Sequence, residues 1–119
     1  MFVLAVFNVL SHNRDDHARQ FSYIMERNGS WHLAPAYDLT WCAGPGGEHS
    51  TSVLGHGKSI TLEHLIELGK KAELTEQDSQ EVIEKIEAAI GNWQVYADES
   101  GVSQDSKEMI ARSLVGLTW

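Results

Sequence analysis

Cysteine is scarce in this sequence, and no long hydrophobic run is present. The single cysteine, Cys42, among 119 residues allows no internal disulfide framework and no zinc site built on two or more cysteine ligands. It favours a reducing compartment, so we expect a cytoplasmic protein. The most apolar stretch, Met1–Leu10, is half the length of about 20 residues that a membrane-spanning helix needs, and it lacks the basic leader of a signal peptide.

Positive charge is also scarce. Nine Lys and Arg residues stand against seventeen Asp and Glu, which gives a formal net charge of −8. Nucleic-acid phosphates repel such a chain, so we expect no direct contact with nucleic acid and no membrane partner. Residues 1–61 carry −1 of this charge and residues 62–119 carry −7, whereas five of the six histidines precede residue 60. We therefore expect any chemistry to lie in the first half.

What the sequence does contain is sufficient for one folded domain. Its hydrophobic fraction of 42% is ordinary for a globular chain that buries a core. Met1–Ser11 is predicted to be a buried helix. Asn28-Gly29, between two short apolar runs, predicts a β-hairpin of two antiparallel strands. The stretch 42–59 is rich in glycine and serine and predicts a long loop.

Three helices are predicted to follow that loop. Thr61 is placed to cap the first, which would run to about Ala72. Thr75 and Asp78 form a variant of the capping box ahead of a second helix that reaches Trp93, and Ser103 is placed to cap the third. The predicted fold class is mainly α with a small β-hairpin (α+β).

Two segments concentrate the residue types that carry chemistry. Residues 12–20, HNRDDHARQ, hold two carboxylates, two imidazoles and two guanidiniums. Asp38 lies in the apolar segment LAPAYDLT, where a carboxylate has to be paired, capped or bound to metal. The hairpin between them returns the chain close to where it left, so Asp15 and Asp38 are predicted to face one small volume. An Asp, a hairpin and a second Asp is the layout of a protein-kinase active site, with a metal-binding side chain five residues after the first Asp.

The segments FNVLSHNRDDHARQFSY, WHLAPAYDLT and GPGGEH, in this order, resemble the C-terminal lobe of HipA-family serine/threonine kinases, the toxins of bacterial toxin–antitoxin pairs. The resemblance implies the helical C-lobe of a kinase-like fold over residues 1–119. Residues 1–60 would carry the catalytic-loop helix, the hairpin and the metal-binding Asp, and residues 61–119 a helical subdomain. It also implies ATP and Mg²⁺ as cofactors, and a protein substrate that is commonly related to translation.

The same resemblance implies a role for individual residues. Asp15 would be the catalytic base and Asp38 the magnesium ligand. His17 and Arg19 would shape the catalytic loop, with Arg19 facing the nucleotide phosphates. Gln20 stands where the family has a metal-binding Asn, and it offers the same amide oxygen to nucleotide-bound metal on an arm one methylene longer.

The chain also departs from the family pattern. The kinases of this family keep a Gly-rich loop and a phosphate-binding Lys ahead of the catalytic loop, but the fourteen residues before Asp15 include neither Lys nor Gly. We therefore expect that the nucleotide-binding N-lobe is lacking and that the isolated fragment is inactive. The expected partners are an antitoxin-type helix-turn-helix protein or the missing N-lobe, and a second copy of the chain packed on the apolar stretch Met1–Leu10.

Other interpretations stay open at this stage. The chain could be a non-catalytic interaction module that binds an antitoxin or a split-kinase partner. Gly57-Lys58-Ser59 matches the end of a phosphate-binding loop, but Ser52 stands where that motif needs its first glycine. A transition-metal site is a further alternative, with the ligands His12, Asp15, Asp16 and His17. We interpret His49 as a loop contact.

Overall fold

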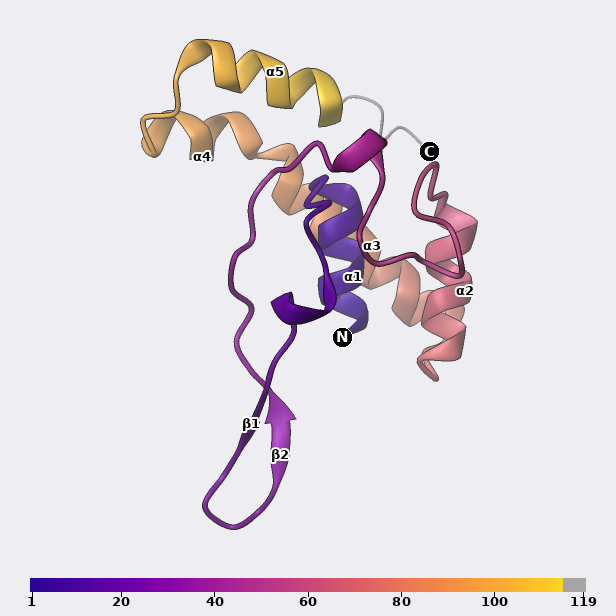
Figure 1. The fold of residues 1–119 in the computed structure, drawn as a ribbon. Helices are drawn as coiled ribbons and strands as arrows, with labels where there is room; N and C mark the ends of the chain where they lie inside the picture. Colours follow the sequence, from indigo (N-terminus) through magenta and orange to yellow (C-terminus); the bar gives the residue numbers. More distant parts are fainter. Residues whose placement is uncertain (115–119) are drawn as a thin grey trace.

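The computed structural model describes residues 1–114 as a helical body from which a β-hairpin projects (Figure 1). The regular elements are α1 (Phe2–Leu10), β1 (Tyr23–Met25), β2 (Trp31–Leu33), α2 (Leu62–Lys71), α3 (Glu76–Gly91), α4 (Trp93–Glu99) and α5 (Gln104–Leu114), with 3₁₀ turns at Ala18–Gln20 and Pro45–Gly47. The predicted class, mainly α with a small antiparallel hairpin, is confirmed. Within residues 1–114 no helix combines the length and the apolar character needed to cross a membrane.

Helix α1 is the centre of the hydrophobic core. It packs against α3 and α2, so its apolar side chains are covered largely by this chain itself. Its residues Val6 and Leu10 are fully buried, whereas Val3, and Met1 just before the helix, remain more than half exposed. The core joins both predicted parts of the domain, and its buried members are Phe2, Val6, Val9, Leu10, Val53, Leu65, Ile66, Ile83 and Ile86.

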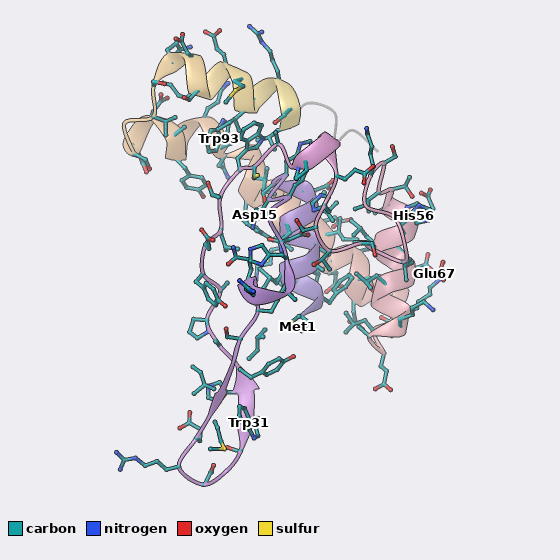
Figure 2. All side chains as sticks on the ribbon, in the orientation of Figure 1. Met1, Asp15, Trp31, His56, Glu67 and Trp93 are labelled. Carbon is teal, nitrogen blue, oxygen red and sulfur yellow. The ribbon has the colours of Figure 1, made fainter. Side chains whose placement is uncertain are left out.

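The hairpin forms where the sequence predicted it. β1 and β2 pair antiparallel, with Tyr23 opposite Leu33. Gly29 adopts a φ of +85°, a left-handed conformation that glycine takes without a steric penalty, and the Asn28 side chain accepts a hydrogen bond from the Ser30 N–H at 2.9 Å. Nearly all side chains of both strands are exposed, and Trp31 at 65% is the most exposed large apolar one (Figure 2).

Helices α2 and α3 begin with the predicted caps. Thr61 and His64 satisfy each other's backbone N–H groups at the start of α2, and Thr75 and Asp78 do the same at the start of α3. The two helices pack closely at Gly69, because a Cβ there would lie 2.1 Å from the Ser79 hydroxyl oxygen. Only glycine permits this approach.

The prediction of three helices after the loop is wrong by one. The second helix does not run through Trp93: it ends at Gly91, and the separate helix α4 begins at Trp93. Gly91 is a weak helix former, and the Asn92 side chain donates to the Ala88 carbonyl at 3.0 Å, which ends α3. The last helix, α5, starts after Ser103 as predicted, with the Ser103 hydroxyl accepting from the Ser106 N–H.

Candidate functional site

The segment that follows α1 is fixed to the body by its backbone. Asn13 is buried, and its side chain donates to the Asn8 side chain at 3.0 Å. The Asn13 N–H donates to the Asn8 carbonyl, and the Cys42 N–H donates to the His12 carbonyl at 2.9 Å. These contacts hold residue 13 beside residue 42, so the chain on both sides of the hairpin starts and ends at one place.

The two adjacent carboxylates of this segment have different environments. The Asp15 side chain is 55% exposed, whereas that of Asp16 is 6% exposed. Asp16 Oδ2 lies 3.0 Å from His49 Nδ1, and its Oδ1 accepts from the Thr51 N–H at 3.0 Å. The Thr51 hydroxyl donates to the Asp16 carbonyl. Asp16 is therefore one attachment point of the glycine-rich loop, beside the Arg14 carbonyl that accepts from the Ser50 N–H, and Asp15 is left facing solvent.

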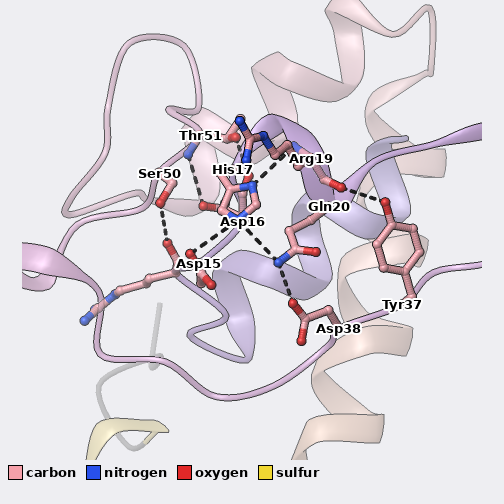
Figure 3. A network of polar contacts seen from close by, with 10 residues as sticks. Asp15, Asp16, His17, Arg19, Gln20, Tyr37, Asp38, Ser50 and Thr51 are labelled. Atoms are coloured by element: carbon pink, nitrogen blue, oxygen red, sulfur yellow. Dashed lines mark hydrogen bonds and ion pairs between the residues drawn. The ribbon is translucent and has the colours of Figure 1, made fainter.

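A line of polar contacts connects Asp15 with Asp38 (Figure 3). His17 Nε2 lies 3.8 Å from Asp15 Oδ1 and 3.5 Å from the Gln20 amide nitrogen. The same nitrogen donates to Asp38 Oδ2 at 2.5 Å. Asp15, His17 and Gln20 come from before the hairpin and Asp38 from after it, so the hairpin does bring the two ends together.

Tyr37 fixes the segment that carries Asp38. Its hydroxyl donates to the Arg19 carbonyl at 2.7 Å, and the Ser22 hydroxyl lies 2.6 Å away. Asp38 itself adopts a φ of +52°, which aspartate tolerates better than most residues. The tyrosine hydroxyl thus joins the strand exit to the 3₁₀ turn, and this positions Asp38 opposite Gln20.

Four of the five residues predicted as a site are thus brought together: Asp15, His17, Gln20 and Asp38. The fifth, Arg19, contributes backbone contacts, because its N–H donates to His17 Nδ1 and its carbonyl accepts from Tyr37, while its side chain is exposed. Two features were missed from sequence. One is the Tyr37 bridge, whose only signal was a polar aromatic next to Asp38. The other is the pairing of Asp16 with residues 49 and 51.

The four candidate ligands of a transition metal do not form a site. Asp16 turns toward His49, and His17 toward Asp15. No group of three or more His, Cys, Asp or Glu side chains arranged to hold a metal ion occurs among residues 1–114. The phosphate-binding-loop alternative also lacks its framework, because Gly57-Lys58-Ser59 is preceded by loop rather than by a strand.

The donor set around Asp38 fits magnesium in its chemistry. Mg²⁺ is usually held by one or two carboxylates together with water and phosphate oxygens, and the exposed Asp38 carboxylate with the Gln20 amide supplies oxygens of that type. The hydrogen bond from Gln20 Nε2 to Asp38 turns the amide nitrogen toward the carboxylate. To offer Oε1 instead, the amide needs only a half-turn about its terminal torsion, which is soft.

A comparison with protein families supports the resemblance noted in the sequence. The model of the HipA-like C-terminal domain matches residues 1–93, which include the whole candidate site. The chain therefore belongs to the HipA-like C-terminal domain family. Neither the search of curated proteins nor the search of solved structures found a match.

His12 is held in a form that resists protonation. Burial, with a further contribution from the neighbouring charges of Arg14 and His49, lowers the pKa of His12 from 6.5 to about 4. Its Nδ1 is buried and has no hydrogen-bond partner among the described residues. The residue has a φ of +53°, a conformation that asparagine also tolerates.

We expect His12 to make stability depend on pH. Between pH 6.5 and about 4 the unfolded chain binds a proton at His12 that the folded chain does not bind, so the free energy of unfolding falls as the pH is lowered through this range. Urea unfolding across the range should show a steeper fall for the wild type than for His12→Asn, which removes the titrating group and suits the backbone. Equal slopes for the two proteins would contradict this assignment.

Proposed function

We propose that this chain is the C-terminal lobe of a HipA-like serine/threonine protein kinase, and that it is inactive until a nucleotide-binding lobe completes it. The observation that carries the proposal is the line of contacts from Asp15 through His17 and Gln20 to Asp38. It supports a shared role for two carboxylates that lie 23 positions apart in a chain of this family.

In this proposal Asp15 is the base. Its exposed carboxylate accepts the proton of a serine or threonine hydroxyl as that oxygen attacks the γ-phosphorus of ATP, whose bond to the bridging oxygen breaks so that ADP leaves. His17, 3.8 Å away, keeps the carboxylate oriented. Asp15 has no short hydrogen bond to a protein donor among the described residues, so its oxygens stay open to a substrate hydroxyl.

Asp38 and Gln20 are the residues that would hold Mg²⁺. When bound, the ion would neutralise charge on the nucleotide phosphates. Tyr37 supports this role indirectly, because its hydrogen bond to the Arg19 carbonyl fixes the backbone on which Asp38 stands. Arg19, with an exposed side chain, is free to reach a phosphate from the same turn.

The biological setting is part of the proposal. A HipA-like kinase would act as the toxin of a toxin–antitoxin pair, phosphorylating a protein related to translation. Its antitoxin would be a helix-turn-helix protein that makes the DNA contacts. The net charge of −8 supports a division in which this chain itself avoids nucleic acid.

The test is reconstitution. The chain is assayed alone and mixed with a HipA-like N-terminal lobe, ideally the one encoded directly upstream, with ATP in the presence and absence of Mg²⁺. We expect Ser/Thr phosphorylation only in the mixture with Mg²⁺, and its loss with Asp38→Asn.

Absence of any transfer in a stable complex of the two pieces would overturn the kinase proposal. Autophosphorylation by the chain alone, or a clear rise of its melting temperature with millimolar ATP, would overturn the inactivity of the fragment.

A second candidate is a non-catalytic interaction module, and the hairpin is the observation that favours it. Tyr23, Met25 and Trp31 are 56%, 58% and 65% exposed on a projecting two-stranded ribbon, which is an unusual amount of apolar surface to leave in water. On this view, binding of an antitoxin or lobe partner is lost with Trp31→Ala and kept with Asp15→Asn, and no phosphorylation accompanies it.

A further inference from the structure

A pocket of about 350 Å³ lies beside the glycine-rich loop, and the proposed phosphoryl-transfer residues do not line it. Four nitrogen-bearing side chains and no carboxylate stand in its lining. Three chain segments supply them: the segment that follows α1, the loop at residues 47–49, and the approach to α2. The lining residues are Val9, His12, Arg14, Gly47, His49, Gly57, Lys58, Ser59 and Ile60.

Arg14 is built into this pocket rather than left on the surface. One guanidinium nitrogen donates to the Ala43 carbonyl at 2.9 Å, and its Nε is buried without a partner among the described residues. The loop closes over it at Gly44, where a Cβ would lie 2.8 Å from the Arg14 Cβ. No carboxylate pairs with Arg14 within residues 1–114. A half-buried guanidinium without a counter-ion favours the binding of an anion, because the anion would pair with its charge and accept its hydrogen bonds.

The other donors are arranged around the same space. His49 is held by Asp16 through Nδ1, so its Nε2 is the ring nitrogen left for a ligand. The Lys58 ammonium makes only a long contact of 3.3 Å with the Gly46 carbonyl and is not ion-paired among the described residues. The pKa of His12 is lowered mainly by burial, and the charges of Arg14 and His49 add to the lowering, which places their positive charge close to this ring.

Two carboxylates nearby have to be weighed against this. Asp16 is already paired with His49 and with the Thr51 N–H, so little of its charge is uncompensated. Glu48 is exposed and lies beside Gly57 at the rim of the pocket. Its negative charge would repel a bound anion, but solvent screens part of this repulsion. The repulsion weakens the attraction of the two cations and two imidazoles for the anion without cancelling it.

We propose that this pocket binds a phosphate group, either as free phosphate or as a phosphomonoester. A planar guanidinium and an ammonium converge on one space with two imidazole rings beside them, and this set matches a tetrahedral dianion with several acceptor oxygens better than a single carboxylate. The proposal does not rest on the kinase assignment, because it uses none of Asp15, Gln20 and Asp38.

The test follows the histidine ring resonances of the whole chain in two-dimensional ¹H–¹⁵N spectra during titration with inorganic phosphate at constant ionic strength. We expect saturable shifts at His12 and His49. Lys58→Gln should raise the phosphate Kd about tenfold, since it removes one hydrogen bond between charged groups. Glu48→Gln should lower the Kd, and Lys71→Gln, which removes an exposed cation from the end of α2, should leave it unchanged.

Parallel titrations identify the source of the phosphate and separate this site from the other one. Tighter binding of phosphoserine than of inorganic phosphate indicates a phosphorylated side chain, and equal binding indicates free phosphate. Asp38→Asn should not alter either titration. Shifts that do not saturate, equal effects of Lys58→Gln and Lys71→Gln, or equal affinity for sulfate would overturn the proposal, and none of them would bear on phosphoryl transfer by the completed kinase.

Discussion

Asp15→Asn is expected to reduce phosphoryl transfer by the completed kinase about 10²–10⁴-fold, the range over which a general base contributes to catalysis. Asparagine has nearly the same shape as aspartate but cannot take the proton from the substrate hydroxyl. The Asp15 carboxylate is 55% exposed and makes only a 3.8 Å contact with His17, so the substitution removes little that the fold depends on. The rate should fall at saturating ATP, while the affinity for ATP changes far less.

The matched measurement is the stability of the same variant. Urea unfolding of Asp15→Asn should agree with the wild type to within about 0.5 kcal/mol, as for surface substitutions in general. A rate within a few-fold of the wild type, in a complex that still forms, would show that another group accepts the proton. A large loss of stability would instead place Asp15 in the structural framework, contrary to its exposure.

Local sequence patterns predicted most of the regular structure. The Asn28-Gly29 turn and the caps at Thr61 and Thr75 depend on contacts between residues at most three or four positions apart, so composition and spacing contain the information. The break between α3 and α4 is of the same kind, but a single Gly91-Asn92 pair competes with a long apolar periodicity. The periodicity suggested one helix where the chain forms two.

The candidate site was predictable only as far as topology fixes it. A hairpin necessarily returns Asp38 toward Asp15, and this argument needs no knowledge of side chains. The connecting residues are different: Tyr37 reaches the Arg19 carbonyl across 18 positions, and His49 reaches Asp16 across 33. The spacing of residues in a glycine-rich loop does not predict which carboxylate the loop will contact.

The sequence distinguishes least between the neighbouring residues Asp15 and Asp16, because adjacent carboxylates look alike in sequence. Position relative to the glycine-rich loop decides between them. One side of the segment faces the loop and is closed by Thr51, which donates from both its N–H and its hydroxyl, and the other side faces His17 and solvent. The structure thus gives two neighbouring aspartates different roles, and substitutions at the two positions should have different effects.

Asp16→Ala is therefore expected to lower the free energy of unfolding by about 2–6 kcal/mol, since two buried groups lose their hydrogen-bond partner at about 1–3 kcal/mol each. Asp16 and His49 are only 6% and 5% exposed in their side chains, so the imidazole would lose its partner without gaining water, and the Thr51 N–H would lose its acceptor. Urea unfolding at neutral pH measures the change, with Asp15→Ala as the matched control at the next position.

Two further variants identify the contact responsible. Asp16→Asn keeps an acceptor oxygen for the Thr51 N–H and should lose less stability than Asp16→Ala. The double variant with His49→Ala should lose less than the sum of the single losses, because residues in one hydrogen-bonded network are coupled by about 0.5–3 kcal/mol. If Asp16→Ala and Asp15→Ala prove equally mild, the attachment of the glycine-rich loop does not depend on this carboxylate. The backbone contacts of Ser50 and Thr51, together with Arg14 beneath Gly44, would then hold the loop.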